Sequence, residues 1–126
     1  MTAATDPTTA TVQLLVEGMW FPVCEPHLLE PGRGVAVLLP GGRQAALFRD
    51  RAGTPYAIGN VDPFTGASVL CRGLLGSADG RPYVASPLLK QRFDLVDGRC
   101  LDDEGVRVPV YPVRVVHPTE PAEPAG

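Results

Sequence analysis

Prolines and glycines interrupt this sequence so often that long helices have little room to form. The 126-residue chain contains 14 prolines and 14 glycines. Proline removes a backbone hydrogen-bond donor and breaks helices, while glycine marks turns. Between these residues lie short runs rich in β-branched and aromatic side chains, which favour strands. The pattern predicts an all-β protein, a small sandwich of short antiparallel strands.

Seven runs of strand length are separated by turn residues. Asp79-Gly80, directly before Arg81, predicts a tight hairpin because both residues tolerate positive φ. The only helical candidate, residues 25–30, is bounded by prolines and has room for about one turn. Two irregular connections, residues 59–78 and 86–91, break the regular spacing, and such connections are often functional. The predicted strands are residues 19–24, 35–39, 44–49, 55–58, 81–85, 108–111 and 113–116.

Length and composition indicate one folded domain with a tail at each end. Hydrophobic residues make up 44% of the chain and charged residues 20%, an ordinary globular composition. Residues 1–11 are rich in threonine and alanine, and residues 117–126 read HPTEPAEPAG. Neither segment shows apolar periodicity, so we expect both to be flexible. The folded domain is expected to span residues 12–116.

The charge and the cysteines narrow the classes of partner and compartment. A net charge of −3 provides no basic face for phosphates and predicts no nucleic-acid partner. The chain has no apolar run long enough to span a bilayer and no ordinary signal peptide. Cys24, Cys71 and Cys100 are widely spaced and indicate free thiols in a reducing compartment. We therefore expect a soluble, cytoplasmic protein with no membrane partner.

The common catalytic and metal-binding motifs are missing. The glycines of residues 32–34 lack the strand-to-helix context of a dinucleotide site. The acidic residues 102–104 lack the alternating spacing of a calcium loop. His27 lies in a proline-bounded turn and His117 begins the C-terminal tail, which argues against a hydrolase. We predict no catalytic residue, no cofactor-binding residue and no metal site in this chain.

The two irregular loops resemble the framework of a Rieske iron–sulfur domain. In that family two loops each present a Cys and a His, as C-x-H and C-x-x-H, to hold a [2Fe–2S] cluster. The proline that follows each Cys has a counterpart in Pro63 and Pro87, and the later F-x-x-x-x-G pattern matches Phe93 and Gly98. The resemblance implies a Rieske-like β-sandwich with its two former cluster-binding loops at one end.

The four ligand positions fall on residues that lack the required donor atoms. The Cys and His of the first loop fall on Asp62 and Phe64, and those of the second fall on Ser86 and Leu89. Oxygen donors do not replace soft thiolates, and carbon side chains have no donor at all. We therefore expect no cluster. Instead, we expect Phe64 and Leu89 to be buried against each other, and Asp62 and Ser86 to hydrogen-bond the loop backbone.

Four longer strings resemble the small subunit of assimilatory NAD(P)H-dependent nitrite reductase. They read N-V-D-P-F, R-G-L-L-G, S-P-L-L-K-Q-R-F-D-L and V-Y-P-V-R-V. In that family a cluster-free Rieske-like subunit accompanies a large subunit, which holds FAD, an iron–sulfur centre and sirohaem and reduces nitrite to ammonia. The resemblance implies an accessory subunit of a cytoplasmic, NADH-dependent enzyme of nitrate assimilation, without a catalytic centre of its own. The alternative is a cluster-free interaction module of another redox enzyme.

A Rieske domain presents its loop end to a partner, so the resemblance implies that this end docks on the large subunit. The exposed groups expected there combine apolar and basic side chains on an otherwise acidic chain, which suits an interface with an acidic rim. The predicted docking residues are Thr65, Arg72, Leu88, Lys90 and Gln91.

Overall fold

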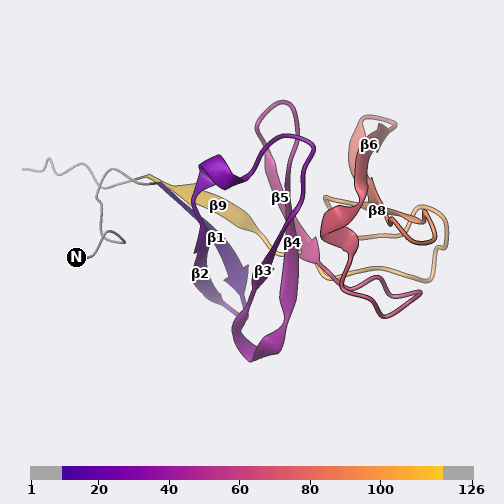
Figure 1. Ribbon diagram of the computed structural model, residues 1–126, viewed down its shortest axis with the longest axis horizontal. Helices are drawn as coiled ribbons and strands as arrows, with labels where there is room; N and C mark the ends of the chain where they lie inside the picture. The colour runs from indigo at the N-terminus through magenta and orange to yellow at the C-terminus, as the bar shows by residue number, and fades with distance from the viewer. Residues whose placement is uncertain (1–9, 118–126) are drawn as a thin grey trace, which may run out of the picture.

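The computed structural model describes residues 10–117, which form nine strands in three antiparallel sheets (Figure 1). The first sheet has the order β2 (Met19–Cys24), β1 (Thr11–Val16), β9 (Val113–Val116). The second has the order β3 (Val35–Leu38), β4 (Gln44–Arg49), β5 (Pro55–Gly59). The third has the order β6 (Leu74–Ala78), β7 (Arg81–Ala85), β8 (Arg92–Asp94). Three 3-10 turns, η2 (Pro26–Leu28), η3 (Pro40–Gly42) and η4 (Leu70–Arg72), connect them, so the all-β prediction is confirmed.

The middle sheet is the centre of the fold because its strand β4 is buried on both faces. Ala45 and Leu47 belong to one hydrophobic cluster, whereas Ala46 and Phe48 belong to another. All four side chains are fully buried. A strand covered on both faces shows a continuous apolar run instead of alternation, and this is the pattern of β4.

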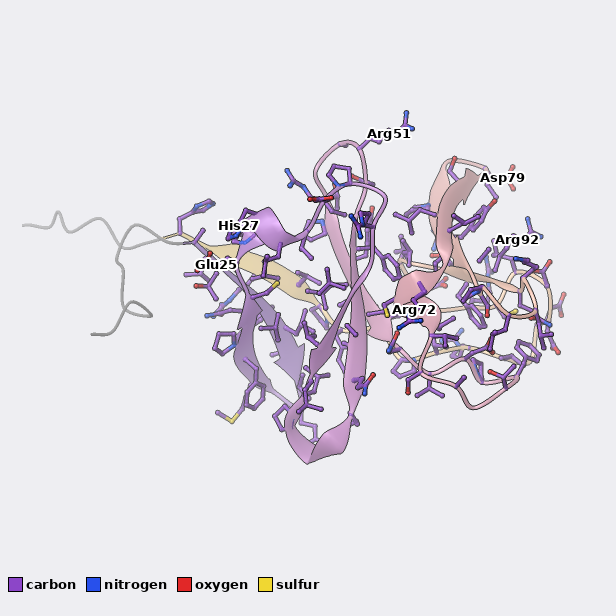
Figure 2. All side chains as sticks on the ribbon, viewed as in Figure 1. Glu25, His27, Arg51, Arg72, Asp79 and Arg92 are labelled. Atoms are coloured by element: carbon purple, nitrogen blue, oxygen red, sulfur yellow. The ribbon has the colours of Figure 1, made fainter. Side chains whose placement is uncertain are left out.

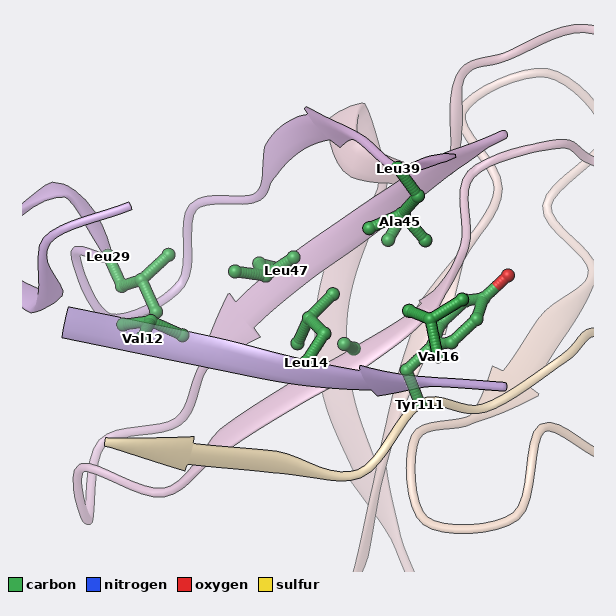
Figure 3. Packing of buried hydrophobic residues seen from close by; sticks show 9 residues of the cluster. Val12, Leu14, Val16, Leu29, Leu39, Ala45, Leu47 and Tyr111 are labelled. Atoms are coloured by element: carbon green, nitrogen blue, oxygen red, sulfur yellow. The ribbon is translucent and has the colours of Figure 1, made fainter. Parts of the chain in front are cut away.

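The first cluster fills the space between the first and middle sheets (Figure 3). Strand β1 contributes Val12, Leu14 and Val16, whose burial alternates with half-buried neighbours that face outward. Leu29 and Tyr111 extend the same cluster. The two packed sheets form the predicted sandwich.

The second cluster holds the third sheet against the opposite face of the middle sheet. Ile58 of β5 and Phe48 of β4 meet Val84 of β7 and Phe93 of β8 in this cluster. Leu70 of η4 is also fully buried there. Leu70, in the connection after the first loop, and Phe93, in the strand after the second loop, thus attach both loops to this cluster.

The hairpin predicted at residues 79–80 is confirmed. Asp79 and Gly80 have φ values of 53° and 79°, and Ala78 pairs with Arg81 across them. Positive φ at both central residues gives the turn the twist that its two strands require. This hairpin sets the register of β6 against β7.

Most predicted elements are present, and the exceptions have physical reasons. The strands at residues 19–24, 44–49, 81–85 and 113–116 are confirmed, those at 35–39 and 55–58 differ by one residue, and η2 lies within the predicted helical turn. The strand predicted at residues 108–111 is wrong, because there only Val110 forms an isolated bridge, with Ile58. Pro109, directly before Val110, has no N–H with which to extend a ladder of hydrogen bonds. Strands β1, β6 and β8 have no counterpart among the predicted strands.

The predicted tails fall mostly outside the residues that the structure describes. Residues 1–9 and 118–126 are in that part of the chain, while Thr11, the last residue of the predicted N-terminal tail, opens β1. No helix within residues 10–117 is long and apolar enough to cross a membrane.

Two neighbouring substitutions in β4 test whether both of its faces are buried. We expect Leu47→Ala to lower the free energy of unfolding by about 2–5 kcal/mol and Phe48→Ala by about 3–5 kcal/mol, as for fully buried residues. Leu38→Ala is the matched control, because Leu38 is 73% exposed and should cost less than about 0.5 kcal/mol. Denaturant unfolding measures all three. A large loss of unfolding free energy at only one of the two neighbouring β4 positions would contradict the burial of both faces of β4 between the first and third sheets.

Candidate functional site at the two loops

The first loop, residues 62–67, is closed by hydrogen bonds around Asp62. The Asp62 N–H donates to the Ala67 carbonyl at 2.8 Å, and the Asp62 carbonyl accepts the Gly66 N–H at 2.7 Å. The Asp62 side chain bends back on the loop, where its Oδ1 accepts the Phe64 N–H at 2.8 Å. This is an Asx turn, in which a short polar side chain takes the place of a backbone acceptor.

The second loop, residues 86–91, repeats this pattern around Ser86. The Ser86 N–H donates to the Gln91 carbonyl at 2.8 Å, and the Ser86 carbonyl accepts the Lys90 N–H at 3.1 Å. The Ser86 Oγ accepts the Leu88 N–H at 3.3 Å. The expectation that Asp62 and Ser86 hydrogen-bond the loop backbone is therefore confirmed.

The two loops share several local features. Each begins with a buried polar residue followed by proline, Pro63 or Pro87. Each has its fifth residue in the left-handed region, Gly66 at φ 79° and Lys90 at φ 70°. That conformation is uncommon for a residue with a side chain, so the backbone bonds of the second loop hold Lys90 in it. The fourth residue of each loop, Thr65 or Leu89, is exposed, whereas the third is half-buried in the first loop and exposed in the second.

A single buried hydrogen bond joins the loops. The Ser86 Oγ donates to the Asp62 Oδ2 at 2.6 Å, and both side chains are fully buried. The Ser86 hydroxyl thus donates one hydrogen bond to Asp62 and accepts one from the Leu88 N–H. Each carboxylate oxygen of Asp62 accepts one hydrogen bond. Asp62 and Ser86 therefore hold the two loops together directly.

Asn60 fixes the start of the first loop to the middle sheet. Its side-chain Nδ2 donates to Gln44 Oε1 at 2.9 Å, and its Oδ1 accepts the Cys71 N–H at 2.8 Å. Its backbone N–H donates to the Gln44 carbonyl, and its carbonyl accepts the Leu70 N–H. A buried Asn with both ends of its amide paired connects β4 to η4. The sequence motif N-V-D-P-F begins at this residue.

The motif that follows the second loop is structural. Phe93 is fully buried in the second cluster. Gly98 has φ 81°, and a Cβ there would come within 2.1 Å of the Val108 carbonyl oxygen, so the position requires glycine. These two positions explain the F-x-x-x-x-G pattern by packing, without a role for a ligand.

Asp94 stabilises the turn between Phe93 and Gly98. Burial by itself raises the pKa of the Asp94 carboxyl, but the Arg81 guanidinium and the backbone N–H groups of Val96 and Asp97 outweigh it and hold this pKa below its usual range. Arg81 Nε donates to Asp94 Oδ2 at 2.6 Å, and the Val96 N–H donates to Oδ1 at 2.7 Å. Asp94 therefore works as a buried anchor for β8.

The predicted burial of Leu89 against Phe64 is wrong. Leu89 is 53% exposed, while Phe64 is half-buried with its ring 6.3 Å from that of Phe93. The local features that the loops share give the reason. Leu89 is the fourth residue of its loop, and its counterpart in the first loop, Thr65, is exposed as well. Each loop turns this position toward solvent, and the Asp62–Ser86 bond joins the loops instead.

The two loops and the adjoining η4 carry exposed apolar and basic groups. Of the predicted docking residues, Thr65, Arg72, Leu88 and Lys90 are exposed, and Gln91 is half-buried. The Gln91 Oε1 is buried and has no hydrogen-bond partner within residues 10–117. Sequence reasoning missed two further exposed apolar residues near the loops, Val61 and Leu74, and placed Leu89 in the interior. Figure 2 shows Arg72 on η4, at the start of the third sheet.

Comparisons with known proteins agree with this architecture. The Rieske-like [2Fe-2S] domain family matches residues 19–119 of the chain. The nitrite reductase (NADH) small subunit of Salmonella typhimurium is 47% identical over 97 residues, which cover 76% of this chain and 89% of that protein. The chain belongs to the family of nitrite reductase small subunits. The sequence-based assignment is thereby confirmed, as is membership of an oxidoreductase family.

Two further relatives extend the comparison. A crystal structure assigned as the NADH-dependent nitrite reductase small subunit of Mycobacterium tuberculosis is 52% identical, with a TM-score of 0.69 over 75% of this chain and 90% of that chain. The Klebsiella oxytoca nitrite reductase [NAD(P)H] large subunit is 44% identical over 98 residues, which make up 76% of this chain but only 10% of that protein.

The donor atoms of this subunit do not match those of the family's [2Fe–2S] cluster. A Rieske cluster needs two thiolates and two imidazoles from the loops. Here the loops offer a carboxylate and a hydroxyl that already bond each other, a phenylalanine ring and an exposed leucine. Within residues 10–117 no three His, Cys, Asp or Glu side chains gather as a metal-ion site would require.

Removing the Ser86 hydroxyl tests the bond between the loops. We expect Ser86→Ala to lower the free energy of unfolding by about 1–3 kcal/mol, because the buried Asp62 Oδ2 loses its donor. Ser68→Ala, at an exposed serine beyond the first loop, is the matched control and should change it by less than about 0.5 kcal/mol. A double-mutant cycle with Asp62→Asn in urea would isolate the pairwise energy. Equal stability of the Ser86→Ala protein and the wild type would show that the bond does not hold the loops.

Proposed function

We propose that this chain is the accessory small subunit of a cytoplasmic, NADH-dependent nitrite reductase. In this role it binds the catalytic large subunit through its loop end and carries no iron–sulfur cluster. The large subunit would hold the FAD, the iron–sulfur centre and the sirohaem that reduce nitrite to ammonia. The observation that carries the proposal is the buried Asp62–Ser86 hydrogen bond, which joins the two loops at the positions that the Rieske resemblance assigns to the cysteine ligands.

The Klebsiella oxytoca relative supports the large subunit as the partner. In that protein a region 44% identical to this chain is part of the large-subunit polypeptide itself. A covalent link keeps the two parts at a high effective concentration, which is useful when they act together. A separate chain of the same kind must achieve the same association through its surface.

The composition of the loop end supports a docking role. Its exposed leucines could enter a pocket on the partner, where desolvated apolar contacts supply most of the affinity. Arg72 and Lys90 at the same end could meet an acidic rim, where charge sets orientation and the rate of association. Neither cation has an ion pair within residues 10–117.

Iron analysis tests the absence of a cluster. We expect the purified subunit to contain no stoichiometric iron and to be colourless, because the two loops lack thiolates and imidazoles. Metal analysis and the visible spectrum after anaerobic reconstitution with iron and sulfide provide the measurement. About two iron atoms per chain, with a Rieske-type spectrum, would refute the proposal.

Charge reversal at the loop end tests the docking surface. We expect Arg72→Glu and Lys90→Glu together to weaken association with the large subunit by about tenfold or more and to lower nitrite-dependent NADH oxidation. Titration and co-purification give the affinity, and the melting temperature should stay unchanged because both side chains are exposed.

The matched control places two reversed charges away from the loop end. Arg114 of β9 stacks on Trp20 in the first sheet, and Arg99 lines a small pocket with Asp79, at the turn end of the β6–β7 hairpin. We expect Arg99→Glu and Arg114→Glu together to leave affinity nearly unchanged. If this pair weakens the complex as much as the loop-end pair, the loop end is not the docking site.

A further inference from the structure

Strand β6 is a sheet edge whose outward backbone groups have no partner within residues 10–117. The order β6-β7-β8 leaves one side of β6 open. Ala78 pairs with Arg81 across a two-residue turn, so the pairs with hydrogen bonds to β7 fall on every second residue from Ala78 back to Leu74. Leu75 and Ser77 lie between these pairs. Their N–H and C=O groups therefore point away from β7, toward the open edge.

Pro82 supports this assignment independently. It lies opposite Ser77 and has no N–H to donate, while its carbonyl accepts the Leu95 N–H on the far side of β7 at 3.0 Å. Natural sheet edges are commonly protected from further pairing by proline or charge. Edge strand β2 has Pro22 within it, but β6 reads LLGSA and has neither protection. The edge of β6 is thus free to pair with another extended chain.

A groove lies along this edge. It has a volume of about 580 Å³ and is lined by residues 74–77 on one side and by Gly32 and residues 50–52 of the β4–β5 turn on the other. Beneath the hairpin the groove also reaches Gly80, Pro82 and Leu95. Figure 1 shows this turn and the β6–β7 hairpin rising next to each other. An extended segment placed in the groove would meet the free backbone groups of Leu75 and Ser77.

Two cations near the groove indicate the charge of its occupant. Arg51 lines the groove, and Arg72 ends η4 just before β6 begins, so the two lie toward opposite ends of the strand (Figure 2). Both are exposed, and neither has an ion pair among the described residues. The carboxylate of Asp50 is already engaged by the Thr54 N–H and the Tyr56 hydroxyl. Asp50 keeps its charge in the lining, and Asp79 is exposed at the turn beyond β6. The two cations toward the ends of the strand, and not the groove as a whole, therefore favour acidic side chains on an occupant.

The same charges disfavour a second copy of this chain as the occupant. Two β6 edges that paired around a twofold axis would run antiparallel, so the Arg51 end of one would face the Arg72 end of the other. Like charges in such positions oppose association. A different chain with acidic residues has no such conflict.

We propose that β6 accepts an extended, acidic segment of the nitrite reductase large subunit, which joins the third sheet as an added strand. The inference rests on the proposed function and adds the mode of recognition, in which backbone hydrogen bonds supply affinity and side-chain charges select the segment. Leu74, 74% exposed at the start of β6, lines the groove and pairs with Ala85, the residue directly before the second loop.

Two substitutions at one position test strand addition. Ser77→Pro removes the outward N–H, and an edge strand tolerates proline at such a position, with Gly76 before it offering no Cβ to clash. We expect this change to weaken binding to the large subunit by about tenfold, since a buried carbonyl on the partner loses its donor. Ser77→Ala keeps the N–H and is the matched control, expected to bind within about twofold of the wild type.

Amide hydrogen exchange on the unmodified complex provides a second test that does not depend on a variant. Strand addition protects the Leu75 and Ser77 amides only when the large subunit is bound. The Gly76 and Ala78 amides, which already pair with β7, stay protected with or without it. This alternation distinguishes an added strand from general coverage of the surface, which would slow exchange without regard to position.

The outcomes separate the two proposals. No binding of the wild-type subunit to the large subunit refutes the proposed function itself. Normal binding that Ser77→Pro leaves unchanged, with Leu75 and Ser77 amides still exchanging freely, refutes strand addition alone. If Ser77→Pro instead converts a dimer of this chain to a monomer without affecting the large subunit, a second copy occupies the edge and the inference is overturned.

Discussion

Two polar side chains without access to solvent, Asp62 and Ser86, meet where the long connections of the third sheet come together. Burying a carboxylate and a hydroxyl is costly unless each finds hydrogen-bond partners. Both do, because each loop supplies one backbone N–H and the serine proton bridges the gap. The position of either loop therefore depends on the other. Whatever surface the loops present to a partner depends on this bond.

The Asp62–Ser86 hydrogen bond has a smaller structural task than the ligands of a metal cluster that joins two loops. Each loop is already closed by its own backbone hydrogen bonds and has as its second residue a proline that restricts φ. Asn60 attaches one loop to the middle sheet, and Phe93 attaches the strand after the other to the core. The loops thus keep their shape individually, and the bond between them only sets their relative position. A single buried hydrogen bond is sufficient for that task, whereas a cluster would also supply electron transfer.

The sequence predicted those parts of the fold that depend on local chemistry. The Asp79-Gly80 turn is determined by two residues, and the loop bonds of Asp62 and Ser86 follow from short polar side chains beside the chain reversal. Strand β6 escaped prediction because Gly76 and Ser77 have weak strand preferences and the strand exists by pairing with β7. The exposure of Leu89 escaped for a similar reason, since it depends on the left-handed Lys90 that closes the loop. The Asp62–Ser86 bond itself joins residues far apart in the chain, and no local pattern specifies it.

The positions of the chain ends explain how the same domain can exist alone or within a larger polypeptide. Thr11 of β1 pairs with Val116 of β9, so the described chain begins and ends side by side in the first sheet. The loops belong to the third sheet, and the middle sheet separates the two (Figure 1). A polypeptide that continues from either end, as in the Klebsiella oxytoca large subunit, leaves from the first sheet without crossing the loops. A domain linked covalently through its first sheet therefore keeps the surface around its loops uncovered by that link, because the middle sheet lies between the two.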